Sequence, residues 1–382
     1  MNEPAFRPPR SLALPFDPLL LLATVGIMIC SLAAIGASTE SNAFVNRQAM
    51  FFAVGFVAMI AISRFDYTRT RELKYGLYGL SIVLIFATWA FGGVTRGSRR
   101  AIQLPFFEVQ TSELVKVLLI LVLSAVVVDR ARDLGSRQTT ARIMLLALIP
   151  AALVMLQPDL GGALVYVMTG VAVLFVAGVP WYRLAVLAGL GAAAIAFVLA
   201  VGPAVGVSVL QDYQLERLTS FLHPSDVQGD AGYQQNQSLI AVGAGQRTGR
   251  GELSSQTNLS FLPETHTDFI FAVVGERWGF VGAAFILTLY ALLLWRGLRI
   301  LTISKNLYGA LIAGAIVAMI LFQLFVNVGM NIGIMPITGL PLPLLSYGGS
   351  SVLTTLIALG LLQSIYAQGR AAAATKGRVL TM

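Results

Sequence analysis

The sequence predicts an all-α integral membrane protein with about ten membrane-spanning helices and one large extracytoplasmic loop. Of its 382 residues, 57% are apolar and only 12% are charged, and the mean hydropathy is +0.78. Soluble domains carry about 25% charged residues, so a water-soluble fold is excluded. The net charge of +8 arises in a mostly apolar chain, and we therefore expect a membrane partner and no nucleic acid.

Ten apolar segments are long enough to cross the membrane. A crossing helix needs about 20 mostly apolar residues, because backbone groups in lipid must pair within the helix. The weakest boundary lies between the fifth and sixth segments, where only Gln157, Pro158, Asp159 and the following glycines intervene. The predicted spans are residues 17–38, 48–63, 75–92, 112–128, 142–157, 160–178, 182–206, 268–295, 307–334 and 344–367.

The positions of Lys and Arg set the predicted orientation, since cytoplasmic loops retain positive charge during insertion. With the N-terminus inside, the cytoplasmic segments hold 17 Lys and Arg and the opposite side holds 7. Lys116 and Arg277 fall inside spans. This bias predicts a multi-pass protein of the cytoplasmic membrane with both termini in the cytoplasm.

The chain is predicted to be a single membrane domain over 1–382. Its large extracytoplasmic loop covers 209–267, between the seventh and eighth spans, and its cytoplasmic tail covers 368–382. The loop holds six acids against three arginines, so any phosphate site on it must be local. The single Cys30 and the two histidines are too few for a metal centre built from Cys or His.

Ionisable residues inside a span are costly and are therefore candidate functional groups. Glu113 and Lys116 are three residues apart at the start of the fourth span, a spacing that places them on one helical face as an ion pair. A purely structural pair and a direct role in a site both fit. Asp159 follows Pro158 between two spans and is expected to cap the sixth helix, which is compatible with a further functional role.

The densest polar cluster, at 262–279, surrounds the start of the eighth span. We expect Thr267 to cap this helix and Asp268 to lie in its first turn, where the helix dipole favours a carboxylate. Asp268 is also placed at the outer membrane boundary, where the head group of a lipid-borne substrate is presented. Glu276 and Arg277 are expected to be internal pairing groups. A purely structural Asp268 is the alternative.

The connection between the last two spans, 327–351, carries no charge but is rich in Pro, Gly and hydroxyl groups. Backbone freed by such residues at membrane depth must line protein or a polar cavity. Loose packing of small residues between helices is the competing interpretation. Ser346 is the hydroxyl in this segment that we expect to bind substrate.

These segments together resemble the SEDS family (shape, elongation, division and sporulation proteins). The resemblance covers essentially the whole chain and rests on 157–159, 262–279 and 333–351, with 97–100 and 112–116 in the expected order. The run 335–343 is similar to the elongation branch; the division branch typically has a lysine near Thr338 and lacks the second of the prolines in this run. Thr111 departs from the family pattern, which usually has proline there.

The resemblance implies an inverting peptidoglycan glycosyltransferase in a bacterial cytoplasmic membrane. Such an enzyme polymerises lipid II into glycan strands during cell-wall elongation and releases undecaprenyl pyrophosphate. It implies a class B penicillin-binding protein (a transpeptidase) and other elongation-complex proteins as partners. A lipid II flippase and a non-catalytic scaffold of the elongation machinery are the alternatives.

The implied reaction needs a base for the attacking hydroxyl and positive charge for the departing pyrophosphate. Asp268 matches the family's essential aspartate and is expected to be the base or the ligand of a divalent cation, Mg²⁺ or Mn²⁺. Guanidinium groups bind phosphate oxygens bidentately. The candidate pyrophosphate ligands are Arg47, Arg99, Arg100 and Arg217, and the residues expected to support the site are Glu113, Lys116, Asp159, Glu264 and His266.

Overall fold

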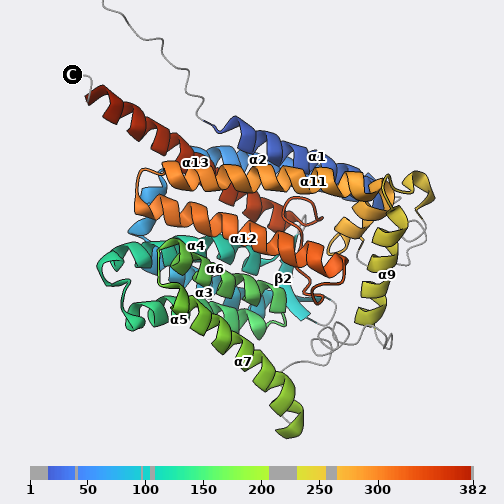
Figure 1. The fold of residues 1–382 in the computed structure, drawn as a ribbon, viewed down its shortest axis with the longest axis horizontal. Coiled ribbons are helices and arrows are strands. Elements are labelled where there is room, and N and C mark those ends of the chain that lie inside the picture. Colours follow the sequence, from blue (N-terminus) through green and yellow to red (C-terminus); the bar gives the residue numbers. More distant parts are fainter. Residues whose placement is uncertain are drawn as a thin grey trace, which may run out of the picture.

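The computed structural model describes residues 16–38, 42–95, 98–103, 108–205, 230–254 and 265–379. These ranges are mostly helical (Figure 1), as the composition predicts. The helices before the large loop are α1 (Pro18–Ser38), α2 (Asn42–Arg64), α3 (Lys74–Phe91), α4 (Thr111–Asp129), α5 (Arg137–Met155), α6 (Leu160–Val176) and α7 (Trp181–Val205). Those after its start are α9 (Asp230–Gly245), α11 (Ile270–Ile303), α12 (Leu307–Asn331) and α13 (Gly349–Val379).

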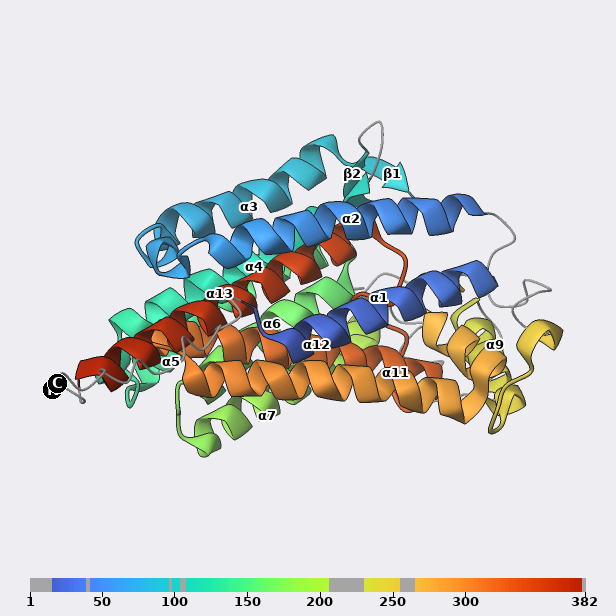
Figure 2. The same ribbon diagram turned by 90° about the horizontal axis from the view of Figure 1, so that it is seen from above.

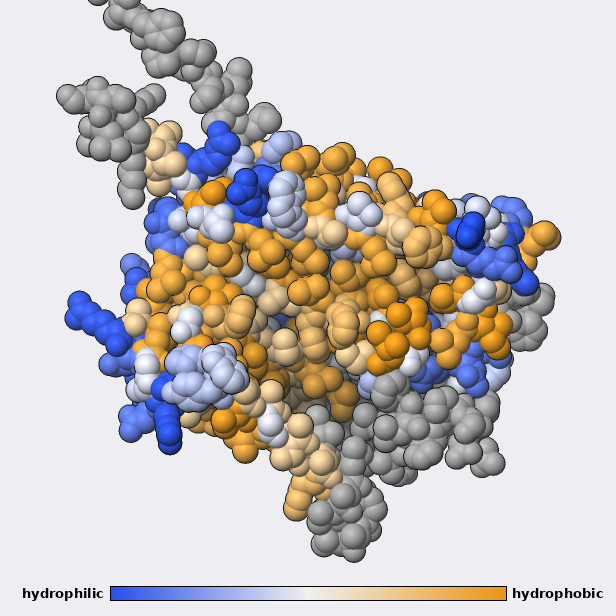
Figure 3. Space-filling model, in the orientation of Figure 1, coloured by the Kyte–Doolittle hydropathy of each residue, from blue (hydrophilic) through white to orange (hydrophobic). Residues whose placement is uncertain are grey.

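Eight helices of the described chain are long and apolar enough to cross a membrane. Two further helices lie among them in the chain: the apolar α6, with 17 residues, and α7, with 25 residues. The space-filling view shows a broad apolar band, with hydrophilic residues gathered at its two ends (Figure 3). The protein is therefore a multi-pass helical membrane protein, as predicted, and the number of ten crossings stays a prediction.

Short elements join the helices at the two ends of the bundle. The connection from α3 to α4 forms a three-stranded antiparallel sheet of β1 (Gly93–Thr95), β2 (Ser98–Gln103) and β3 (Glu108–Val109). We call this the outer end and the opposite end the inner end, following the predicted orientation. The 3-10 turns are η1 (Tyr67–Arg71), η2 (Ala131–Asp133) and η3 (Gly251–Leu253).

The centre of the bundle is formed by α4, α12 and α13, in which most residues of the apolar stretch are buried. Helix α13 packs along α2, and α11 packs along both α1 and α12 (Figure 2). The buried residues form one large apolar cluster that spans these helices. Because the three central helices all have an end at the outer face, side chains there are held by a rigid scaffold.

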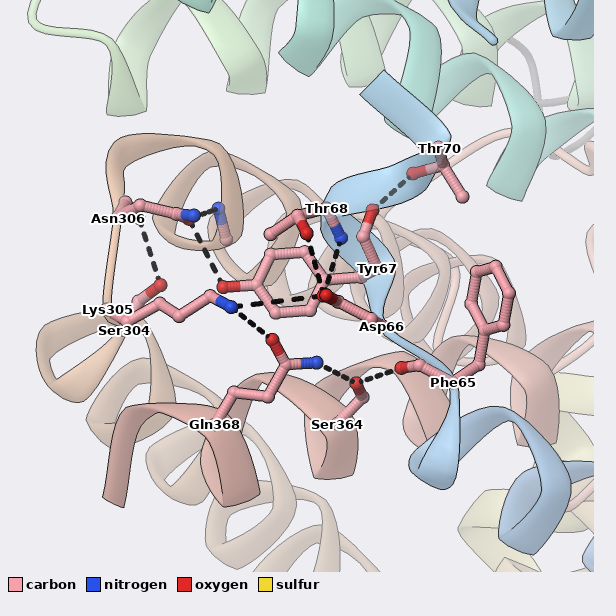
Figure 4. A network of polar contacts seen from close by, with 11 residues as sticks. Phe65, Asp66, Tyr67, Thr68, Thr70, Ser304, Lys305, Asn306, Ser364 and Gln368 are labelled. Carbon is pink, nitrogen blue, oxygen red and sulfur yellow. Dashed lines mark hydrogen bonds and ion pairs between the residues drawn. The ribbon is translucent and has the colours of Figure 1, made fainter. Parts of the chain in front are cut away.

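At the inner end, a polar network joins two connections to helix α13 (Figure 4). Asp66 accepts hydrogen bonds from the backbone N–H and the hydroxyl of Thr68, and its carboxylate lies 3.8 Å from the Lys305 ammonium. Lys305 donates to Gln368, and Ser364 of α13 donates to the Phe65 carbonyl. The network ties the end of α2 and the α11–α12 turn to α13.

This network predicts a small pH-dependent contribution to stability. The hydrogen bonds from Thr68, aided by Lys305, hold the pKa of Asp66 below its ordinary value. A lowered folded-state pKa stabilises the protein above the unfolded pKa of about 3.9 and the effect is lost as the pH falls further. We expect Asp66→Asn to cost less than about 1 kcal/mol at pH 7 and less near pH 3, because the contribution is lost as the pH falls through the lowered pKa of Asp66. Thermal unfolding at the two pH values measures this, with exposed Glu72→Gln as the control; an equal cost at both would contradict it.

The structure corrects the start of the eighth span and shows helical structure within the predicted loop and tail. Helix α11 begins at Ile270 with Phe269 as its N-cap, so Asp268 is not in the first helical turn and Thr267 is not the cap. The predicted loop 209–267 contains α9 and η3. Helix α9 begins at Asp230 and packs on α11. Helix α13 continues through Val379, so residue 368 is not a helix end.

Candidate functional site

Asp268 lies at the outer end, in the turn that leads into α11. Its residue is half-buried and its backbone carbonyl accepts hydrogen bonds from Asn327 (2.9 Å) and Asn331 (3.2 Å), one helical turn apart on α12. The Asn331 amide oxygen also accepts from the backbone N–H of Ala272 at 3.1 Å. Asn331 of α12 therefore caps the start of α11, a role that the sequence predicted for Thr267.

A second set of bonds holds the residues just before Asp268. The Ser346 hydroxyl donates to the Thr267 carbonyl at 2.6 Å and accepts from the Leu342 N–H at 2.8 Å. The Tyr347 N–H donates to the His266 carbonyl at 2.8 Å. Ser346 is buried, so the structure gives this predicted substrate ligand a positioning role in the segment that carries Asp268.

His266 supports the same segment through its ring. Its centroid lies 4.8 Å from that of Phe44 on α2 and 5.6 Å from that of Tyr347. Phe44 and Tyr347 are also in edge-on contact at 5.2 Å. The three rings pack α2, the Asp268 turn and the chain before α13 against one another, and the supporting role of His266 in the site stays a prediction.

Gln48 is a positioning residue that the sequence analysis missed. This fully buried side chain donates to the Ser346 carbonyl (3.2 Å) and the Ser31 hydroxyl (3.4 Å), and accepts from the Gly348 N–H (3.3 Å). Ser31 in turn donates to the Leu345 carbonyl at 2.7 Å. One amide thus joins α1, α2 and 345–348, and its only sequence signal was a polar residue near the start of an apolar helix.

Asp159 organises a neighbouring polar cluster. Its carboxylate accepts the Gly162 N–H at 2.8 Å, which is the predicted cap of α6. The other oxygen accepts from the Gln110 amide (3.2 Å) and the Ser112 hydroxyl (3.1 Å) at the start of α4. The Gln110 N–H also donates to the hydroxyl of Ser350 in the first turn of α13. The starts of α4, α6 and α13 are therefore tied together at the outer end.

Residues 338–340 connect this cluster to the Asp268 turn. Asn327, which holds the Asp268 carbonyl, also donates to the Leu340 carbonyl at 2.8 Å. On the opposite side, a Cβ on Gly161 of α6 would lie 2.9 Å from the Thr338 carbonyl oxygen. Only glycine permits this approach, so α6, the Pro-rich segment and α12 pack as one unit at the outer end.

The predicted Glu113–Lys116 ion pair is present. The Lys116 ammonium lies 2.6 Å from the Glu113 carboxylate, and both side chains are buried, with 1% and 6% of their surface exposed. Removing one partner of such a pair is strongly destabilising, because a buried charge is left unpaired. The Tyr166 hydroxyl donates to the Ser112 carbonyl in the same turn of α4.

Helix α11 is broken at Gly279, whose φ of 63° and ψ of −158° are not helical. The chain after α9 fills the break: the N–H groups of Phe280 and Val281 donate to the carbonyls of Gln246 and Arg247, and the Arg250 N–H donates to the Glu276 carbonyl. Arg277 forms an ion pair with Glu252 at 2.7 Å. These backbone bonds fasten the turn after α9 to the break in α11.

The predicted arginine ligands are only partly described. Arg47 is exposed on the outer part of α2. Arg99 and Arg100 lie on β2, but their side chains are outside the described residues, as are Arg217 and Glu264 altogether. Their role in pyrophosphate binding stays a prediction.

The donor set fits a divalent cation only in part. The described residues contain no group of three or more His, Cys, Asp or Glu side chains that could hold a metal. Mg²⁺ typically uses one or two carboxylates together with waters and substrate phosphates. The Asp268 carboxylate can supply one ligand in that arrangement, with the remaining ligands from substrate and water.

Asn331 should be more important for folding than its polarity suggests. Asn331→Ala removes one buried hydrogen bond each from the Ala272 N–H, the Asp268 carbonyl and the Ser238 hydroxyl, and each of these groups keeps one other partner. We expect a loss of about 2–3 kcal/mol of stability together with reduced activity. Thermal unfolding and turnover of the purified variant measure both; an unchanged unfolding temperature would contradict the capping role.

Known proteins share both the sequence and the fold. Residues 13–371 match the FtsW/RodA/SpoVE family, described as "Cell cycle protein". The chain is 35% identical to the peptidoglycan glycosyltransferase MrdB of Escherichia coli K12, covering 92% of this chain and 93% of that protein. It is 36% identical to the stage V sporulation protein E of Bacillus subtilis, with coverages of 91% and 94%.

Two solved structures agree with the fold. A chain from a study of "structural coordination of polymerization and crosslinking by a peptidoglycan synthase complex" is 32% identical, with a TM-score of 0.77 and coverages of 93% and 99%. The rod shape determining protein RodA of Thermus thermophilus is 29% identical, with a TM-score of 0.67 and coverages of 94% and 98%. The chain therefore belongs to the FtsW/RodA/SpoVE family, which is the SEDS family.

Proposed function

We propose that Asp268 is the catalytic group of this peptidoglycan glycosyltransferase, which joins the saccharides of lipid II into glycan strands at the outer membrane face. The names of the relatives support the enzyme class. The observation that supports the residue is its position: Asp268 is half-buried at the outer end, and its backbone carbonyl is bound from α12 by Asn327 and Asn331. Such fixation holds a reacting group in a productive geometry.

The reaction needs one proton acceptor and a stabilised leaving group. The attacking sugar hydroxyl forms a bond to the anomeric carbon of the second saccharide, and its proton passes to the Asp268 carboxylate. The bond from that carbon to pyrophosphate breaks, and its electron pair stays on the phosphate oxygen. Direct displacement inverts an α-linked donor into a β-linked product. Arginine side chains at the outer end, Arg47 among them, stabilise the departing pyrophosphate.

Asp268 as a ligand of a divalent cation is the second role that the donor set permits. A bound Mg²⁺ or Mn²⁺ would neutralise charge on the pyrophosphate. Ser346, His266 and the two asparagines would keep the carboxylate oriented in either case. Glu113, Lys116 and Asp159 support the neighbouring helices and do not take part in the bond change.

The partner proposed for this chain is a class B penicillin-binding protein that crosslinks the strands. The similar solved chain comes from a synthase complex that coordinates polymerisation and crosslinking, which supports such an assembly in the elongation machinery. We place the chain in the bacterial cytoplasmic membrane with both termini inside, in keeping with the distribution of Lys and Arg.

The test is the conversion of lipid II by the purified protein together with its partner, with and without a chelator. Glycan strands are expected, and their absence in both conditions would contradict the enzyme assignment. Loss of product on chelation, with recovery on adding Mg²⁺ or Mn²⁺, would assign Asp268 to the metal. Full activity in chelator would assign it as the base.

A further inference from the structure

The connection from α12 to α13 turns sharply at Leu344. The Leu345 N–H donates to the Leu342 carbonyl at 3.1 Å, so Pro343 and Leu344 occupy the two central positions of a turn. The φ of Leu344 is 66°. Proline followed by a residue with positive φ is the pattern of a type II turn, whose second central position normally takes glycine or asparagine. This turn, 342–345, which we call the Leu344 corner, therefore has leucine where the backbone favours glycine.

The left-handed conformation of Leu344 is costly for a residue with a Cβ. Among the non-glycine residues that the structure describes, only Leu344 combines a positive φ with a buried side chain. That side chain belongs to the large apolar cluster of the bundle, and glycine would lose this packing. A strained conformation persists only where the surrounding structure holds it, so the corner depends on its neighbours.

Two buried hydroxyl groups hold the backbone on either side of Leu344. The Tyr290 hydroxyl of α11 donates to the Pro343 carbonyl, and the Ser31 hydroxyl of α1 donates to the Leu345 carbonyl. Both of these side chains are fully buried, so the loss of either hydroxyl removes a hydrogen bond that water cannot readily replace. The corner is thereby fixed from α1 and α11 together.

The corner also sets the direction of the chain that holds the Asp268 turn. Ser346 and Tyr347 follow the corner and donate to the carbonyls of the two residues before Asp268. A change of φ at Leu344 rotates the chain that follows and therefore moves both donors. The conformation of the corner and the position of Asp268 are coupled in this way.

We propose that Tyr290 is a positioning residue for the reaction, because its hydroxyl keeps the Leu344 corner left-handed and thereby holds Asp268 in place. The inference rests on the proposed function, in which Asp268 is the catalytic group. Tyr290 is fully buried and lies roughly 16 Å along α11 from the break at Gly279, so it acts through the corner and does not touch substrate. A displaced catalytic group lowers turnover and leaves substrate binding unchanged.

The test compares Tyr290→Phe with Tyr308→Phe in the full chain together with its partner synthase. Tyr308 is also buried, and its hydroxyl donates to the Leu121 carbonyl and contacts the Thr70 hydroxyl at the inner end. Tyr308→Phe should therefore lower the unfolding temperature at least as much as Tyr290→Phe. Only Tyr290→Phe is expected to lower kcat for lipid II, by about tenfold with KM unchanged.

Glycine at position 344 provides a second test. Glycine adopts a positive φ without strain, so the corner in Leu344→Gly no longer depends on the Tyr290 hydroxyl. In this background Tyr290→Phe should lower kcat by less than about threefold, and the difference from the tenfold loss measures the coupling of the two residues. The comparison with Tyr308→Phe decides by itself if the glycine variant does not fold.

Three results would overturn the inference: wild-type kcat in Tyr290→Phe, an equal loss of kcat in Tyr290→Phe and Tyr308→Phe, or an equal loss from Tyr290→Phe with leucine and with glycine at position 344. Asp268→Asn is assayed in parallel. Full polymerisation by Asp268→Asn would contradict the proposed function, whereas an inactive Asp268→Asn beside a fully active Tyr290→Phe would contradict only the positioning role.

Discussion

Asp268→Asn is expected to reduce lipid II polymerisation by about 10²- to 10⁴-fold, the usual contribution of a general acid–base group. The amide keeps the shape of the side chain but cannot accept the proton or provide the charge for a cation. Asn327 and Asn331 bind the backbone carbonyl of residue 268, so the turn should keep its conformation. Rates from strand formation on gels, with unfolding temperatures alongside, measure both effects.

The control is Glu252→Gln, another acid at the outer end. Its carboxylate pairs with Arg277 but is 93% exposed, and exposed pairs contribute little to stability. We expect nearly full activity from this variant. Asp268→Ala should behave like Asp268→Asn; a well-folded Asp268→Ala protein with wild-type polymerisation would leave the carboxylate without a catalytic role.

Gly279→Ala is expected to cost about 3 kcal/mol or more of stability. The φ of 63° and ψ of −158° at Gly279 belong to a region that is essentially restricted to glycine. A Cβ there would also lie 2.7 Å from the Thr248 nitrogen and the Arg247 carbonyl carbon. Both groups are backbone atoms of the turn that fills the helix break, so they cannot move aside without breaking the bonds to Phe280 and Val281.

Gly243→Ala on α9 is the matched control for this variant. A Cβ at Gly243 meets nothing within 4 Å, and alanine is favoured over glycine within a helix by about 1 kcal/mol. Thermal unfolding should therefore separate a strongly destabilised Gly279→Ala from an unchanged or slightly stabilised Gly243→Ala. Equal unfolding temperatures for the two variants would show that the helix break is not fixed by its neighbours.

Patterns of local spacing gave the parts of the site that lie within one helix. The separation of Glu113 and Lys116 by three residues predicted their ion pair, and the position of Asp159 before α6 predicted its cap. Apolar segment lengths predicted the multi-pass helical fold. These features involve residues that are close in the sequence, and helical periodicity predicts which of those residues are in contact.

Contacts between distant segments could not be predicted in the same way. The start of α11 is capped by Asn331, which is 59 residues from Ala272, so local rules placed the helix start too early. The hydrogen bonds of the Ser346 hydroxyl to Thr267 and Leu342 were also not predicted, and substrate binding by Ser346 stays a prediction.

The break in α11 at Gly279 is accompanied by a glycine pattern in the sequence. Gly245 and Gly249 are four residues apart, as are Gly275 and Gly279. Side chains at any of these positions would meet the backbone or side chain of the facing segment. Two glycine pairs with this spacing permit the two backbones to approach closely, which the apolar pattern of 268–295 alone did not reveal.

The most direct test of catalysis at Asp268 uses vesicles that contain the protein with its partner synthase and labelled lipid II. Both glycan strand formation and movement of lipid II between the leaflets are measured, for wild type and for Asp268→Asn. Strands from wild type and none from Asp268→Asn, with equal amounts of folded protein, are the predicted result. Movement of lipid II without strands in wild type would contradict the account and identify a flippase.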